Sequence, residues 1–437
     1  MLLASLALIP LGLSLPDAAV KSAALLVRRP CSVVSFTGND RHRLLHGLST
    51  ADVESLRKQR GALETAVVDA AGNVQGLLTV MDDGGDELLA LAEPDRGEAS
   101  RAFFDKYIFP ADAVEVADAS DAHASCCLEL AGPLAAEVLG AAVAGGQAAL
   151  PSAGGAVRLG IGDDADALIV GIGSLGYAAP AVEAQALASE AADGAAADGS
   201  ASCFSVLLAD DAAADLCYTA LAAGVERVGG HLASSWEALR IRRGRPTHGL
   251  EYASSHAPKA SPFSLGLWHL VTPEKGCFLG NEVLVRLARA KRQKLELYGV
   301  RLDGSGETTV GTEVFVDEEA STKAEAEGGT DLLGASRRSV GVLTSVLEGD
   351  EEGESSFALA LVRPPAADVG VRVLVGGVAG ELVDLPFATR GRVGAADSEG
   401  EDDDAAAKAA AAKAAEAERK AAKLKAMQEK MKALGLA

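Results

Sequence analysis

The stretch PEKGCFLGNEVLVR, residues 273–286, carries the pattern from which the fold and the chemistry of this chain are predicted. Cys277 lies between Lys275 and two glycines, Gly276 and Gly280. Glycines allow tight backbone turns, and a nearby cation lowers the pKa of a thiol. These neighbours predict a redox or thiol-exchange role for Cys277. A transient contact with a metal or cluster, and simple packing, are the alternatives.

A nucleophilic thiol normally works with a base. His269 is the histidine nearest to Cys277 in the sequence and is therefore the candidate for that role.

Positive charge gathers around this stretch. The segments SSWEALRIRRGRP (234–246) and LGLWHLVTPEKGCFLGNEVLVRLARAKRQK (265–294) contain the basic residues Arg240, Arg242, Arg243, Arg245, Lys275, Arg286, Arg289, Lys291, Arg292 and Lys294. Because this local charge opposes the sign of the whole chain, it predicts a bound anion, and Trp268 offers a flat face for a planar ring. A basic helix face that balances nearby acidic loops is the alternative.

The composition limits the classes of protein. The 437 residues are 49% hydrophobic, which is enough for two or three domains with their own cores. The formal net charge of −22 argues against a general nucleic-acid binder and against an acidic membrane surface as partner. The six cysteines form no CxxC pair, which favours a reducing compartment over a disulfide scaffold or a cysteine-rich zinc site.

The two ends of the chain differ in composition from its middle. Residues 1–27 begin with an apolar run and are interpreted as the remnant of an organellar leader or transit peptide, with a packed first helix as the alternative. Residues 394–437 comprise an acidic linker and an Ala/Lys-rich helical tail. The tail is expected to be a single exposed helix; binding to a partner protein is the alternative.

Two short patterns are weak signals. GIGSLG, residues 171–176, matches a dinucleotide-binding loop but lacks the acidic residue that ribose recognition needs, so an ordinary glycine-rich turn is favoured. His42 and His46 are four residues apart, yet no third ligand follows, so no metal site is predicted.

Hydrophobic periodicity predicts an α+β fold with mixed or antiparallel sheets. Between residues 30 and 245, hairpins alternate with helices; examples are a strand at 32–36, a helix from residue 41 and a hairpin around Gly72 and Asn73. After Lys294 the chain consists of short β-rich runs bounded by Gly, Asp and Ser, which predicts a small antiparallel β-barrel over residues 294–393.

The motif KGCFLGNE resembles the KGCYxGQE signature of YgfZ-type proteins, folate-binding relatives of the glycine-cleavage T-protein (aminomethyltransferase), and is most similar to their plastid branch. SFTGNDRHRLLHGLSTADV, DKYIFPADAVEV, WEALRIRRGRP and VGVLTS resemble other parts of the family, so the similarity spans about residues 28–392. It implies a T-protein-like folate-binding core of two subdomains over residues 28–293, followed by the barrel.

The resemblance also implies a function. It predicts a folate-linked accessory protein that supports assembly or repair of iron-sulfur clusters, with tetrahydrofolate as cofactor and iron-sulfur client or assembly proteins as partners. The implied location is the chloroplast stroma, with the mitochondrial matrix as alternative. Cys277 is the expected working thiol, and the residues expected to bind a folate-like anion are Lys275, Glu282, Arg286, Trp268, Arg240 and Arg242.

The chain departs from the family pattern at several positions. Gly76 and Leu77 stand where the T-protein has an acidic pair that serves aminomethyl transfer, which counts against the alternative function of a tetrahydrofolate-dependent aminomethyltransferase. Arg242 stands where the family has a glutamate that accepts hydrogen bonds from the pterin ring, and a guanidinium cannot accept them. Within the signature itself, Phe278 replaces tyrosine and Asn281 replaces glutamine.

Overall fold

The computed structural model describes residues 23–162, 165–172, 203–290, 293–304, 308–317, 339–348, 356–364, 366 and 368–388. The chain divides into two compact units, Met1–Arg390 and Gly391–Ala437, and every described residue belongs to the first. Most of the predicted leader, residues 173–176 of the GIGSLG motif and the predicted helical tail lie outside the described residues.

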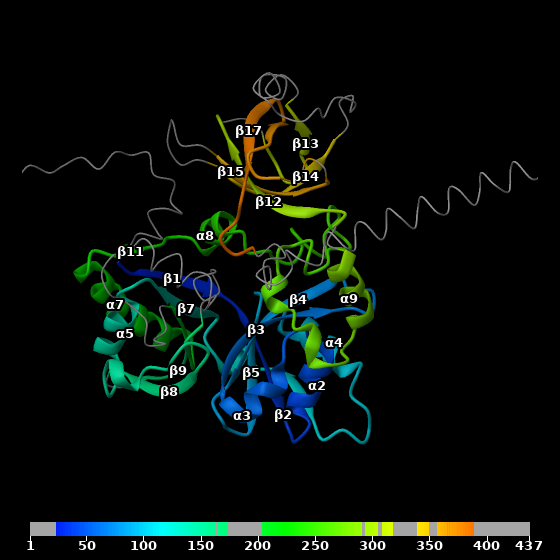
Figure 1. Cartoon of the computed structure of the whole chain (residues 1–437). Helices are drawn as coiled ribbons and strands as arrows, with labels where there is room; N and C mark the ends of the chain where they lie inside the picture. The colour runs from blue at the N-terminus through cyan, green and yellow to red at the C-terminus, as the bar shows by residue number, and fades with distance from the viewer. Residues whose placement is uncertain are drawn as a thin grey trace, which may run out of the picture. The chain divides into compact units, whose positions relative to one another are not determined.

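A five-stranded antiparallel sheet has the order β3-β4-β5-β2-β6 (Figure 1). Its strands are β2 (Ser32–Thr37), β3 (Gly61–Val68), β4 (Val74–Asp82), β5 (Glu87–Ala92) and β6 (Glu115–Asp118). Helices α2 (Arg41–Leu48) and α4 (Gly97–Asp105) pack on it through Leu45 and Phe104, both buried. The short elements η1 (Val53–Ser55) and α3 (Leu56–Gln59) connect α2 to β3.

The predicted hairpin around Gly72 and Asn73 is confirmed as β3 and β4. The carboxylate of Asp69 accepts hydrogen bonds from the backbone N–H groups of Ala71 and Asn73, both at 2.9 Å. Gly72 adopts a φ of 77°, which glycine tolerates because it has no Cβ. Local turn chemistry therefore sets this connection.

A six-stranded mixed sheet has the order β11-β1-β7-β10-β9-β8, in which only the described pair β1 and β11 is parallel. Its strands are β1 (Leu25–Pro30), β7 (Cys126–Ala131), β8 (Ala156–Ile161), β9 (Ala165–Val170), β10 (Cys203–Leu208) and β11 (His231–Leu232). Helices α5 (Ala135–Ala142) and α7 (Asp211–Arg227) cover its apolar core, and η2 (Ser120–Ala122) and η3 (Gln147–Ala149) lie in its connections.

Strand β1 corrects the boundary predicted between residues 27 and 28. Leu25, Leu26 and Val27 are at most 1% exposed and pair with β7, so they belong to the folded core and not to a leader. An apolar run is typical of a buried strand as well as of a leader peptide. Here the run forms a strand that pairs with β7.

The predicted barrel is confirmed as a closed antiparallel barrel of order β12-β15-β14-β13-β16-β17 (Figure 1). Its strands are β12 (Glu296–Leu302), β13 (Glu313–Val316), β14 (Gly341–Leu347), β15 (Phe357–Val362), β16 (Arg372–Val375) and β17 (Val378–Val383). Strand β17 was not anticipated as a separate strand; it pairs with both β12 and β16 and so closes the barrel. Closure leaves no unpaired edge strand in the barrel.

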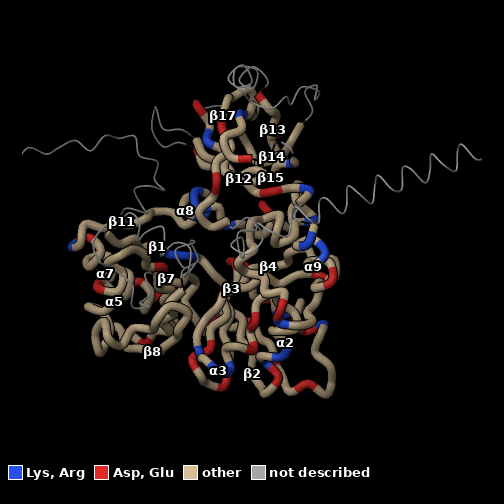
Figure 2. The backbone as a smooth tube through the Cα atoms, viewed as in Figure 1, with Lys and Arg blue, Asp and Glu red and all other residues tan. Residues whose placement is uncertain are grey.

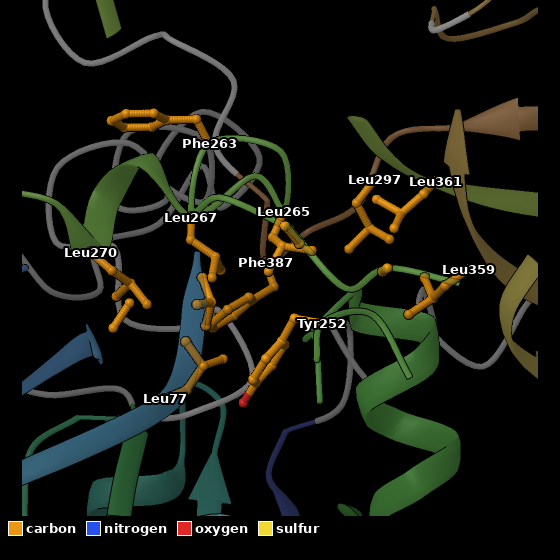
Figure 3. Packing of buried hydrophobic residues seen from close by; sticks show 14 of the residues in the cluster. Leu77, Tyr252, Phe263, Leu265, Leu267, Leu270, Leu297, Leu359, Leu361 and Phe387 are labelled. Atoms are coloured by element: carbon orange, nitrogen blue, oxygen red, sulfur yellow. The ribbon is translucent and has the colours of Figure 1, made fainter. Parts of the chain in front are cut away.

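The segment between the second sheet and the barrel contains α8 (Trp236–Arg243), η4 (Trp268–Leu270), η5 (Pro273–Lys275) and α9 (Asn281–Ala290). An apolar cluster joins this segment to β4 and to the barrel through Leu77, Tyr252, Leu267, Leu359 and Phe387 (Figure 3). Lys and Arg positions recur along α8 and α9 (Figure 2). The fold is thus α+β with antiparallel and mixed sheets, as predicted.

Candidate functional site

The loop around Cys277 has a backbone that requires glycine. Gly276 and Gly280 have φ angles of 103° and 79°. At Gly280 an added Cβ would come within 2.6 Å of the carbonyl oxygen of Asp69, in the β3–β4 hairpin. This close approach fixes the start of α9 against the hairpin and explains the glycine at position 280.

Cys277 is exposed, whereas Cys126 is partly buried and the other four cysteines are buried. Burial raises the pKa of the Cys31 and Cys217 thiols to about 12. Since the thiolate is the reactive form, those sulfurs are unreactive near neutral pH. Cys277 is therefore the thiol that solution reaches most readily.

The thiol of Cys277 opens onto a surface hollow of about 660 Å³. The lining residues are Cys277, Phe278, Asn281, Glu282, Val285, Arg286 and Arg289, and we call this hollow the Cys277 pocket. Helical spacing places the last five on one face of α9, because residues four apart are neighbours on a helix. The lining of the pocket thus combines a cysteine, apolar side chains and charged groups.

The charges of the Cys277 pocket favour an anion. Glu282 pairs with Arg286 at 2.7 Å, and both side chains are largely exposed. In the described part of the chain no carboxylate pairs with Arg289. The pocket therefore presents one more cation than anion within a chain of net charge −22.

Lys275 does not point its charge at Cys277. Its Nζ donates hydrogen bonds to the carbonyl oxygens of Ser49 at 2.6 Å and Ala51 at 2.9 Å, and to that of His46. These carbonyls lie in the last turn of α2 and in the three residues that follow it, and a cation is favourable at the C-terminal end of a helix. Burial lowers the pKa of Lys275 to about 8, against the opposing effect of Asp52. The expectation that this lysine activates the neighbouring thiol is not supported by its contacts.

Arg240 is buried in a network of ion pairs rather than exposed to a ligand. It is 2% exposed and its guanidinium contacts Glu237 at 2.6 Å and Glu251 at 3.2 Å. It also donates to the hydroxyl of Ser345 at 2.9 Å, and that hydroxyl donates to Glu251 at 2.5 Å. Because Ser345 lies on β14, this network holds α8 against the barrel.

Arg242 and Trp268 are also not among the residues that line the Cys277 pocket. Arg242, on α8, is 7% exposed. The Trp268 ring packs against Phe263 with ring centroids 4.1 Å apart, so one of its faces is covered. Of the predicted site residues, the structure therefore brings together Cys277, Glu282 and Arg286, and adds Arg289.

A buried polar network was not predicted. Arg245 pairs with Glu64 of β3 at 2.8 Å, and Arg29 of β1 pairs with Glu129 of β7 at 3.2 Å. A detectable signal was present, because Glu64 and Glu129 are single charged residues inside otherwise apolar strands. Such a residue is rarely fully buried unless it is paired.

His269 belongs to this buried network and is not among the residues that line the Cys277 pocket. Burial lowers its pKa to about 4, with Glu64 opposing and Arg245 reinforcing the shift. Its ring packs edge-on against Phe387, with centroids 5.1 Å apart. The expected base for Cys277 therefore lies elsewhere in the fold.

Among the described residues, no three His, Cys, Asp or Glu side chains gather as metal ligands. In the same residues, no helix has both the length and the hydrophobicity needed to cross a membrane.

The chain is similar in sequence to a plant protein and in fold to solved structures. No family model matches the sequence. The Arabidopsis thaliana protein named "Putative transferase At1g60990, chloroplastic" is 26% identical over 373 residues, which cover 82% of this chain and 69% of that protein.

Among solved structures, the glycine cleavage system aminomethyltransferase T from Bartonella henselae is similar with a TM-score of 0.59 and 16% identity, over 85% of this chain and 88% of that one. A heterotetrameric sarcosine oxidase from Corynebacterium sp. U-96 matches half of this chain with a TM-score of 0.30. The chain therefore has the fold of the aminomethyltransferase T, as its sequence predicted.

Proposed function

We propose that this protein is a YgfZ-type, folate-linked accessory protein that supports assembly or repair of iron-sulfur clusters, with Cys277 as its working thiol. One observation carries the proposal: the exposed thiol lies in a pocket with a net positive charge, on the loop that resembles the family signature. Thiolates bind iron and exchange with other sulfur species, so an accessible thiol suits handling of clusters or of their sulfur.

The link to folate is proposed from the fold and from the charges of the pocket. The guanidinium groups of Arg286 and Arg289 suit the carboxylates of a folate glutamate tail, since guanidinium donors match carboxylate geometry. Position 242 supplies no carboxylate for the pterin ring, because Arg242 occupies it. We therefore propose that the tail, rather than the ring, supplies the recognition at this pocket.

Aminomethyl transfer is not the proposed reaction. Gly76 and Leu77 occupy the positions of the family's acidic pair on β4, and Leu77 is 1% exposed within an apolar cluster. A purified-protein assay for methylenetetrahydrofolate formed from the aminomethyl donor tests this point, and we expect no turnover.

The proposed location is the chloroplast stroma, and the proposed partners are iron-sulfur client or assembly proteins. The chloroplastic name of the Arabidopsis relative supports the organelle. A fluorescent fusion of the full chain, compared with plastid and mitochondrial markers, tests it.

The experiment that tests the function is rescue in cells that lack the native protein. Cys277→Ser is expected to lose most of the iron-sulfur enzyme activity that the unchanged protein restores, whereas Cys126→Ser, at a partly buried thiol, retains it. Full rescue by Cys277→Ser would remove the thiol from the proposal.

Folate binding is measured separately by calorimetry with tetrahydrofolate and its polyglutamates. Affinity is expected to rise with the number of glutamates and to fall about tenfold in Arg289→Gln, the change expected for one lost charged hydrogen bond. Arg301→Gln, at an exposed arginine on the barrel strand β12, is the matched control. If no folate gives a heat of binding, the proposed link to folate is overturned. The proposed role of Cys277 is then tested separately by the rescue experiment.

A further inference from the structure

The loop that carries Cys277 is bonded to the end of α2 by hydrogen bonds in both directions. From the loop side, the N–H of Thr272 donates to the carbonyl of Thr50, and the N–H of Leu279 donates to that of Gly47, both at 2.9 Å. From the α2 side, the Thr50 hydroxyl donates to the carbonyl of Leu270 at 2.6 Å. Residues on both sides of Cys277 are therefore held by a segment more than 200 positions away in the sequence.

His46 adds a bond at the centre of the loop. Its Nε2 lies 3.2 Å from the carbonyl oxygen of Lys275, and its Nδ1 lies 3.3 Å from the backbone nitrogen of Glu54 and 3.2 Å from a carboxylate oxygen of Asp52. A neutral ring accepts at Nδ1 from Glu54, and a protonated ring donates there to Asp52. In both states Nε2 carries a hydrogen and donates a hydrogen bond to the carbonyl oxygen of Lys275.

The Lys275 side chain completes the connection. Its three N–H donors match the three carbonyl oxygens of His46, Ser49 and Ala51. Its Nζ also lies 4.7 Å from the centre of the Phe278 ring, which lines the Cys277 pocket. All three N–H groups of the ammonium are therefore used by carbonyl oxygens, and none is left to donate to the Cys277 sulfur. The ammonium also contacts the ring of Phe278, the residue that follows Cys277.

We propose that Lys275 is a positioning residue for Cys277: its ammonium clamps the loop to the C-terminal end of α2 and so keeps the thiol in the pocket that Arg286 and Arg289 also line. The positive charge of that pocket comes from those arginines, and Lys275 acts through geometry. The inference rests on the proposed function only in taking Cys277 as the working thiol. Its test uses the purified full-length protein and needs neither folate nor an iron-sulfur enzyme.

The test compares alkylation of Cys277 by iodoacetate, an anion, and by iodoacetamide, which is neutral. A thiol held in a pocket that two arginines line reacts preferentially with the anionic reagent, so the ratio of the two rates reports the position of the thiol. Lys275→Arg keeps the charge, but a planar guanidinium cannot direct its N–H groups to three converging carbonyls. We expect this variant to lower the ratio by about threefold, the effect of a unit charge moving away by several ångströms in water.

Hydrogen exchange provides a second readout. Backbone amides of residues 272–280 are expected to lose protection in Lys275→Arg and Lys275→Met, while the amides of the sheet that contains β3 and β4 keep it. Lys259→Met, at an exposed lysine, is the matched control and should leave both readouts unchanged. Arg289→Gln should lower the alkylation ratio and leave the protection of the loop intact.

A wild-type ratio in Lys275→Arg together with a reduced ratio in Lys275→Met would show that charge, not position, is the contribution of Lys275, and would overturn the inference. Unchanged loop protection in both variants would also overturn it. If neither variant folds, His46→Ala removes the one side-chain bond from His46 to the loop, together with the ring's contacts to Glu54 and Asp52. It is expected to change both readouts in the same direction, by smaller amounts.

Discussion

At the scale of single residues, the backbone of the Cys277 loop depends on two glycines for different reasons. Gly280 combines a positive φ with a close approach to the carbonyl of Asp69, whereas no atom lies within 4 Å of a Cβ added at Gly276. The first glycine is needed for space and for conformation, and the second for conformation alone.

Gly280→Ala is therefore expected to lower the free energy of unfolding by about 3 kcal/mol, since backbone strain and a steric clash add. Gly276→Ala should lower it by only about 1 kcal/mol, the lower end of the range for a strained φ. Urea unfolding of both variants measures the difference. Equal losses would contradict the assigned role of the Asp69 contact.

Lys275 is close to Cys277 in the sequence, but its ammonium group is bonded elsewhere. Adjacent residues in a loop project in different directions, and here the ammonium faces the end of α2 while the thiol faces the pocket. Sequence proximity alone predicted activation of the thiol, because cations near thiols commonly have that effect.

At the scale of elements, a buried ion pair and its hydrogen bonds connect α8 to the barrel. Arg240 and Glu251 are 2% and 0% exposed and share the Ser345 hydroxyl of β14. Removing one partner of a buried pair leaves the other charge in a poorly solvating environment.

Arg240→Met is therefore expected to destabilise the protein by about 3–5 kcal/mol. The matched control is Arg286→Met, whose pair with Glu282 is mostly exposed and should contribute less than about 0.5 kcal/mol. Urea unfolding measures both. Similar losses in the two variants would mean that burial does not set the strength of the Arg240 pair.

At the scale of the whole described core, a buried network joins parts of the chain that are far apart. Glu64 of β3, Arg245 after α8, His269 of η4 and Phe387 near the end of the described chain contact one another in ion-pair or ring contacts. Such a network ties the five-stranded sheet to segments that pack against the barrel.

This network predicts a pH dependence of stability. Burial lowers the pKa of His269 from 6.5 to about 4, so the unfolded chain takes up a proton before the folded one does. Stability is then lost as the pH falls from 6.5 towards 4, by about 3 kcal/mol for this group. Urea unfolding between pH 7.5 and pH 4.5 measures it.

His269→Gln is the comparison for that measurement, because it removes the titrating group and should flatten the pH dependence relative to the unchanged protein. His123 and His248, whose pKa values are also lowered chiefly by burial, titrate in both proteins and cancel in the difference. The same slope in both proteins would show that His269 is not protected from protonation.

The sequence by itself determined the hairpin of β3 and β4, the antiparallel strands of the barrel and the glycine-dependent loop around Cys277. These features follow from alternation of apolar residues and from turn chemistry, which act over a few residues. Only the tertiary structure decided that Leu25–Val27 join a sheet, that Arg240 and His269 are buried, and that Lys275 holds α2 while Arg289 faces the Cys277 pocket. The physical reason is that burial and charge pairing depend on groups that folding brings together from distant parts of the chain. The spacing of residues along the sequence does not show which of these groups will be in contact.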